Sequence, residues 1–97
     1  IIMKIITVCG NGIWSSLMLA MKIQELCDAE GIPANVESCD ANSASGKTCD
    51  LYVTVKELAP NLDQSKTLIV RSYTNKKKIK EDILEVLKSK SLELNNN

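Results

Sequence analysis

Residues 4–16 decide the fold, and they read Lys-Ile-Ile-Thr-Val-Cys-Gly-Asn-Gly-Ile-Trp-Ser-Ser. The β-branched run Lys4–Val8 predicts a buried strand. Two glycines and an asparagine then predict a tight loop that uses left-handed backbone dihedrals. Ser15 and Ser16 are residues that commonly start a helix. The stretch therefore predicts a strand, a loop and a helix in direct succession.

The rest of the chain repeats this alternation. We expect the first helix to run to about residue 30, where Gly31 closes it. Further strands are expected at 35–38, 50–55 and 66–70, with a loop at 40–47 and a short helical turn at 56–62 between them. The last helix is expected at 75–90, with an apolar stripe of Ile79, Ile83, Val86 and Leu87. Strands that alternate with helices predict right-handed crossovers and a parallel sheet. The expected fold class is α/β: a four-stranded parallel sheet in the order 2-1-3-4 with helices on both faces, a three-layer sandwich. We expect one domain over residues 1–97, with its core at about 3–90 and a tail or linker at 91–97.

The charge balance and the content of cysteine and histidine argue against several classes of function. The 97 residues carry 12 basic and 12 acidic side chains, a balance that does not point to nucleic acid or an anionic membrane.

The basic run Lys76–Lys78 at the start of the last helix is interpreted as a solvated face, with a patch for an acidic partner or lipid headgroups as the alternative. The four cysteines form no Cys-x-x-Cys pair and histidine is absent, which argues against zinc and against a Cys-His couple. No metal or cofactor is expected. With no secretory signal apparent, we expect reduced thiols and a cytoplasmic protein.

Cys9 is the candidate reactive residue, because it ends the first predicted strand, where ligands bind in parallel sheets. The amides at the start of the next helix make an anion site that would stabilise the thiolate and later hold a phosphoryl group on sulfur. The alternative is a cysteine that only fills the core. Glycine, asparagine and serine neighbours are poor core material, so we favour the functional interpretation. The expected phosphate-binding loop consists of Gly10, Asn11, Gly12, Ile13, Trp14, Ser15 and Ser16.

Tyrosine phosphatases also place a thiolate in a loop before a helix, but they need an arginine six residues later to clamp the phosphoryl oxygens. That position is Ser15 here. The single arginine, Arg71, follows the fourth predicted strand and could reach the site only from there. Without such a clamp, fast hydrolysis is not expected.

The first helix is apolar on two sides. One side should pack on the sheet through Leu19, Ala20, Ile23, Leu26 and Cys27. Leu17, Met18 and Met21 lie on the opposite side, beside the loop. We interpret them as a partner-docking surface and keep simple overpacking as the alternative.

These residues resemble the IIB component of the bacterial phosphoenolpyruvate-dependent sugar phosphotransferase system, the ascorbate type most closely and the galactitol type next. The ascorbate-type loop reads Cys-Gly-Asn-Gly-x-Gly-Ser-Ser, and it is matched by Cys9, Gly10, Asn11, Gly12, Ser15 and Ser16. The resemblance extends over residues 18–26, 35–39 and 49–53. It implies a protein-N(π)-phosphohistidine–sugar phosphotransferase component: a phosphohistidine donor on a IIA protein, a phosphocysteine at Cys9, and transfer to a carbohydrate-like substrate in a membrane-embedded IIC protein. It also implies a cytoplasmic chain associated peripherally with that transporter.

Trp14 departs from the pattern, because the family has glycine there. Either the loop is reshaped or the position never needed a positive φ. The side chain is interpreted as an aromatic contact for a partner or a cyclic substrate, or else as a partly buried anchor under the loop. Two other functions stay open: a non-enzymatic phosphate-dependent regulatory module on the same scaffold, and a low-molecular-weight phosphatase-like hydrolase.

Overall fold

The computed structural model describes residues 2–10, 14–44 and 46–95. Its sheet has four parallel strands in the order β2-β1-β3-β4, which confirms the predicted topology. The strands are β1 (Met3–Cys9), β2 (Ala34–Asp40), β3 (Leu51–Thr54) and β4 (Thr67–Ile69). Each predicted strand is present, with ends shifted by one or two residues from the predicted bounds.

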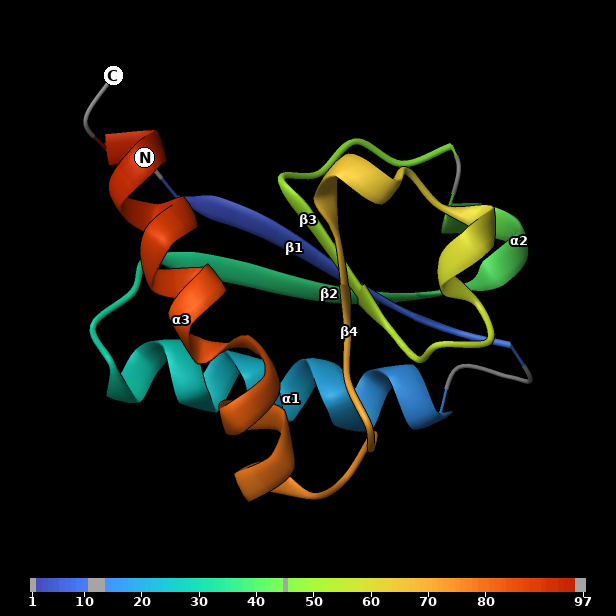
Figure 1. The fold of residues 1–97 in the computed structure, drawn as a ribbon, viewed down its shortest axis with the longest axis horizontal. Coiled ribbons are helices and arrows are strands. Elements are labelled where there is room, and N and C mark those ends of the chain that lie inside the picture. The colour runs from blue at the N-terminus through green and yellow to red at the C-terminus, as the bar shows by residue number, and fades with distance from the viewer. Residues whose placement is uncertain (1, 11–13, 45, 96–97) are drawn as a thin grey trace.

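Two layers of unequal thickness cover the sheet. Helices α1 (Trp14–Ala29) and α3 (Lys76–Asn95) lie together over one face. The other face carries the short helix α2 (Ala41–Ala44) and the 3₁₀ turns η1 (Ala59–Asn61) and η2 (Gln64–Lys66), as Figure 1 shows. The predicted three-layer sandwich is therefore confirmed, with one thin outer layer.

Side chains of β1 alternate between two cores, as a strand buried on both faces requires. Met3 and Ile5 join the larger core with α1 and α3, whereas Ile6 and Val8 join the smaller one on the α2 face. The five residues predicted to pack α1 on the sheet are all buried: Leu19, Ala20, Ile23, Leu26 and Cys27.

Helix α1 ends as its sequence predicts. Gly31 adopts a φ of 69°, and the amides of Gly31 and Ile32 donate to the carbonyls of Asp28 and Cys27 at 3.3 and 2.8 Å. This pair of bonds is the Schellman arrangement, which favours glycine at the left-handed position because glycine has no Cβ. It turns the chain sharply back toward β2.

Three predictions about the helices were wrong. The expected loop at 40–47 contains α2, which forms because the Asp40 carboxylate accepts a hydrogen bond from the Ser43 amide at 2.8 Å. Helix α3 continues to Asn95 instead of ending near residue 90, and Leu94 packs partly against the larger core. Val86 is 41% exposed and does not belong to the buried stripe of α3.

Candidate functional site

Cys9 is the last residue of β1, and the first turn of α1 lies beside its sulfur. The Cys9 thiol donates a hydrogen bond of 3.1 Å to the hydroxyl of Ser16, and both residues are buried. Ser16 is the third residue of α1, so the sulfur lies near a helix N-terminus, where anions are stabilised. The strand and the helix of the predicted motif are thus brought together at this sulfur.

The three fully buried polar side chains among the described residues are Thr7, Ser16 and Thr54, and all three lie around Cys9. The Thr7 hydroxyl donates to the Ser16 carbonyl at 2.6 Å, and the Thr54 hydroxyl donates to the Val8 carbonyl at 2.9 Å. Burying a hydroxyl is costly unless it is hydrogen-bonded, so each of these groups must be placed accurately. Their concentration at one point marks a built polar site inside an otherwise apolar core.

A cavity of about 280 Å³ lies at this site. Gly10 and Glu57, which help to line it, are exposed, so the cavity reaches the surface. Its described lining consists of Cys9, Gly10, Ser15, Val55, Glu57, Leu58 and Tyr73. Although Cys9 is only 2% exposed, it is therefore one of the residues that line a cavity open to the surface.

The described part of the predicted loop gives mixed results. Of the three loop residues expected to allow left-handed dihedrals, Gly10 is the one described; its φ is not positive, and a Cβ added there would meet Leu58 Cδ2 at 3.5 Å, an ordinary contact. Trp14 is 70% exposed, so the idea of a partly buried anchor is wrong. Its position also begins helix α1, an ordinary place for a bulky residue. Asn11, Gly12 and Ile13 lie outside the described residues, and so do the amides expected to converge on phosphate there.

Sequence reasoning missed the far wall of the cavity. Val55, Glu57 and Leu58 follow β3, and Tyr73 follows β4. The signal that could have found them is their position directly after predicted strands, because the carboxyl ends of parallel strands meet at one edge.

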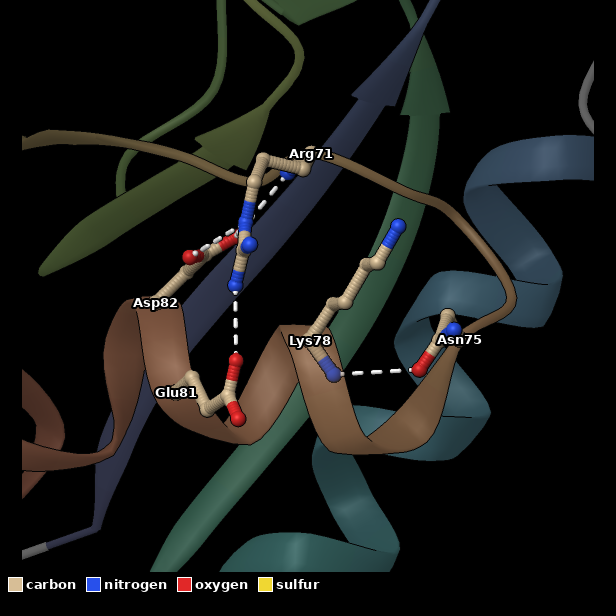
Figure 2. Close-up of polar contacts among 5 residues, drawn as sticks. All are labelled: Arg71, Asn75, Lys78, Glu81 and Asp82. Atoms are coloured by element: carbon tan, nitrogen blue, oxygen red, sulfur yellow. Dashed lines mark hydrogen bonds and ion pairs between the residues drawn. The ribbon is translucent and has the colours of Figure 1, made fainter.

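Arg71 does not reach the cavity. Its guanidinium donates to Asp82 and Glu81 at 2.9 Å each, both on the first turns of α3 (Figure 2). These two carboxylates raise the pKa of Arg71, and Arg71 in turn lowers the pKa of Asp82. Asn75 caps the same helix end by accepting from the Lys78 amide at 3.1 Å. The described lining of the cavity therefore contains no arginine that could act as a phosphatase-type clamp.

The outer side of α1 exposes a row of apolar side chains beside the site. Trp14, Leu17 and Met21 are 70%, 41% and 53% exposed and follow one another at helical spacing, whereas Met18 is partly buried. A larger cavity of about 670 Å³ lies between this row and β2, and Cys9 does not line it. Its lining includes Leu17, Met21 and Val36.

The other three cysteines are buried: Cys27 lies in α1, Cys39 in β2, and Cys49 just before β3. Burial, assisted by the Asp28 carboxylate, raises the pKa of Cys27 to about 11. Burial also raises the pKa of Cys39 and of Cys49. These thiols are therefore poor nucleophiles at neutral pH.

Two further features concern the surface. Lys76 and Lys80 form ion pairs with Glu25 and Glu30 at 3.2 and 4.0 Å, which agrees with a solvated face. Within residues 2–10, 14–44 and 46–95, no helix has the length and apolar character needed to cross a bilayer.

Among the comparisons with known proteins, a solved structure shows the fold and a family model shows the family. The solution structure of a low molecular weight protein tyrosine phosphatase from Bacillus subtilis matches with a TM-score of 0.56 and 15% identity, over 98% of this chain and 100% of that one. At that identity the likeness shows the fold alone. No curated protein matches the sequence.

A family model described as "PTS system, Lactose/Cellobiose specific IIB subunit" matches residues 4–89. This description supports a IIB component but not the ascorbate or galactitol type that the loop resembles. Such a component has a IIA donor and a membrane IIC partner and serves as a phosphocarrier in sugar uptake. With most of its length matched, the chain belongs to the IIB-subunit family of the sugar phosphotransferase system.

Proposed function

We propose that Cys9 takes a phosphoryl group from a phosphohistidine of a IIA protein and passes it to a carbohydrate-like substrate bound in the IIC protein. The observation that carries this proposal is the position of Cys9: its sulfur contacts Ser16 in the first turn of α1, and the residue lines the 280 Å³ cavity. The protein would act in the cytoplasm, docked on the membrane component.

The chemistry consists of two in-line displacements. In the first, Cys9 gives up its thiol proton and the thiolate attacks phosphorus; the S–P bond forms, the N–P bond of the donor histidine breaks, and the histidine leaves as a neutral imidazole that has taken up a proton. In the second, a substrate hydroxyl attacks phosphorus, the S–P bond breaks, and the hydroxyl proton leaves to solvent or to the departing thiolate. The Ser16 hydroxyl, which accepts from the thiol, can rotate to donate to the thiolate. The loop amides of residues 10–16 would hold the phosphoryl oxygens.

The cavity is large enough for this group. A bound water takes about 30 Å³, and a phosphoryl group needs only a few times that volume. The phosphoryl group carries a charge of about −1.5 to −2. Because the described lining holds Glu57 and no basic side chain, the charge would be balanced by amides and hydroxyls alone. Weak electrostatic clamping suits a carrier, whose phosphoryl group must leave again.

The exposed row on α1 is the proposed docking surface for the two partner proteins. The row comprises Trp14, Leu17 and Met21, and the partly buried Met18 lies beside it on the same helix; Leu17, Met18 and Met21 are the docking residues that the sequence predicted. Its apolar side chains begin at the start of α1, directly after the loop that follows Cys9, so a partner that covers them would bring its phosphorylated residue near the sulfur.

The substrate type is the finer part of the proposal. Cys9, Gly10, Asn11, Gly12, Ser15 and Ser16 favour an ascorbate or galactitol type, whereas the matched family description names lactose and cellobiose. Transfer from phosphorylated protein to each of these substrates, in vesicles that contain the corresponding IIC protein, distinguishes the types. Phosphorylation of lactose or cellobiose alone would contradict the loop-based assignment.

A phosphatase is the second candidate, favoured by the shared fold. The pairing of Arg71 with Glu81 and Asp82 speaks against it. Hydrolysis of an aryl phosphate by the isolated protein, abolished by Cys9→Ser, would support a phosphatase. A regulatory module would bind phosphate without forming a covalent adduct.

The testing experiment combines the protein with phosphoenolpyruvate, the general phosphotransferase proteins and a IIA protein, followed by intact-mass measurement. The proposal predicts a gain of one phosphoryl group that Cys9→Ser abolishes and Cys49→Ser, the matched control, preserves. An unchanged mass while the IIA protein is phosphorylated would overturn the proposal.

A further inference from the structure

The carbonyl oxygen of Val8 accepts hydrogen bonds from two hydroxyls. Thr54 Oγ1, at the end of β3, donates at 2.9 Å, and the Tyr73 hydroxyl, in the loop after β4, donates at 3.2 Å. This carbonyl belongs to the peptide unit that contains the Cys9 nitrogen. Two neighbouring segments of the chain therefore fix the orientation of the peptide from which the reactive side chain projects.

Tyr73 has a second link to the site, because it is one of the residues that line the cavity together with Cys9. The residue is partly buried. Burial raises the pKa of its phenol, so the hydroxyl keeps its proton and remains a donor at neutral pH. The loop that carries Tyr73 is held in turn by the Arg71 amide, which donates to Asp82 at 3.0 Å.

We infer that Tyr73 is a positioning residue for phosphoryl transfer. Its hydroxyl, together with that of Thr54, holds the Val8 carbonyl and hence the Cys9 peptide, and the residue also lines the cavity that would receive the phosphoryl group. The inference rests on the proposed function of Cys9 and assigns a role that the loop sequence does not contain.

The physical reason is alignment. Phosphoryl transfer requires the attacking sulfur, the phosphorus and the leaving nitrogen to lie nearly in line, and a small misplacement of the nucleophile costs rate. Two hydroxyls on one acceptor can partly replace each other. Removing one hydroxyl should therefore raise the activation free energy of transfer by less than half of the increase caused by removing both. Such non-additivity is expected of groups that share a partner.

The chain offers a matched control for this idea. Tyr52 is the other tyrosine, and its hydroxyl donates to the Ala44 carbonyl at 2.8 Å on the α2 face of the sheet. Tyr52→Phe therefore removes a comparable hydrogen bond away from the Val8 carbonyl. Thr54→Ser serves as the conservative variant that keeps the second hydroxyl.

The experiment measures rapid-quench phosphoryl transfer from a phosphorylated IIA protein to each variant, over a range of IIA concentrations, alongside thermal unfolding. We expect Tyr73→Phe and Thr54→Val each to lower the maximal rate about threefold to tenfold without changing KM, as loss of one hydrogen bond predicts. The maximal rate of the double variant should decrease by a factor larger than the product of the two single-variant factors. Thr54→Ser and Tyr52→Phe should transfer at the wild-type rate.

Three results would overturn the inference: wild-type transfer in Tyr73→Phe, a change confined to KM, or an equal rate loss in Tyr52→Phe. All three leave the proposed function intact, because the wild-type protein still becomes phosphorylated. Failure of the wild-type protein itself to accept phosphate would instead remove the proposed function on which the inference rests.

Discussion

The Sγ atom of Cys9 and the Oγ atom of Ser16 lie 3.1 Å apart, inside the protein and across the junction between β1 and α1. A thiol that only filled the core would need no polar partner. Here the partner sits in the first turn of a helix and is itself fully buried. The pair therefore joins the strand that ends at the site to the helix end that stabilises negative charge.

Alkylation of the cysteines should separate reactivity from exposure. Cys49 is 9% exposed and Cys9 only 2%, so access alone predicts modification of Cys49 first. Our account predicts Cys9 first, because burial raises the pKa of Cys49 and leaves it a poor nucleophile. Iodoacetamide at pH 7.5, about one equivalent, followed by peptide mass spectrometry gives the order. Modification of Cys49 ahead of Cys9 would contradict an activated sulfur at Cys9.

Removing the Ser16 hydroxyl should slow the chemistry of Cys9. Ser16→Ala keeps the backbone carbonyl that Thr7 binds, so the variant loses the contact with sulfur while that scaffold bond remains. A hydrogen bond to a charged group contributes about 1.5–3 kcal/mol, which corresponds to a decrease of about tenfold to a hundredfold in the rate of alkylation or phosphoryl transfer. Unchanged rates in a folded Ser16→Ala protein would show that the hydroxyl plays no part.

The ion pair at the start of α3 should give an acid-dependent contribution to stability. The pKa of Asp82 is lowered, chiefly by the hydrogen bond from Arg71, below the ordinary value of about 3.9. The bond therefore stabilises the fold fully above that value, and its contribution disappears as the pH falls through the lowered pKa.

Urea unfolding of Asp82→Asn tests this. The variant should be slightly less stable than the wild type at pH 7, since the pair is partly exposed, and the difference should vanish near pH 2. Glu85→Gln, on an exposed position of the same helix, is the control and should show no such difference. A difference that stays constant with pH would contradict the assigned cause.

A substitution in the docking surface should weaken binding of the IIA donor without changing the reactivity of Cys9. Met21→Glu places a charge in the exposed row on α1 and should raise the KM for the IIA donor about tenfold or more, because it buries an unpaired charge in the interface. Its thermal stability and the alkylation rate of Cys9 should stay at wild-type values. Leu92→Glu, at a 64% exposed apolar position near the end of α3, is the matched control. Equal effects of the two variants would remove the docking surface.

The sequence predicted those parts of the fold that depend on local pattern. The run at residues 4–8, the glycine closing α1 and the apolar spacing of α1 each specify one element, and these elements together imply the parallel sheet. Helix α2 was missed because four residues carry no helical period, and its start depends on one side-chain bond from Asp40. The exposure of Val86 was missed because the width of a buried stripe depends on where neighbouring helices lie.

The candidate site divides in the same way. Cys9 and Ser16 are close in sequence, so their contact follows from a short loop between a strand and a helix. Tyr73 and Thr54 reach the same point across separations of 65 and 46 residues from Val8, which only the order of the strands brings about. Arg71 is the opposite case. Its position after β4 left open that it reaches the site of Cys9, but its guanidinium instead forms ion pairs with two carboxylates of α3.

The most direct test locates the phosphoryl group itself. After transfer from a phosphorylated IIA protein, tandem mass spectrometry at neutral pH should place one phosphoryl group on Cys9, and addition of the membrane IIC protein with its substrate should remove it. A phosphoryl group on any other residue, or one on Cys9 that the IIC protein and substrate leave in place, would contradict the account.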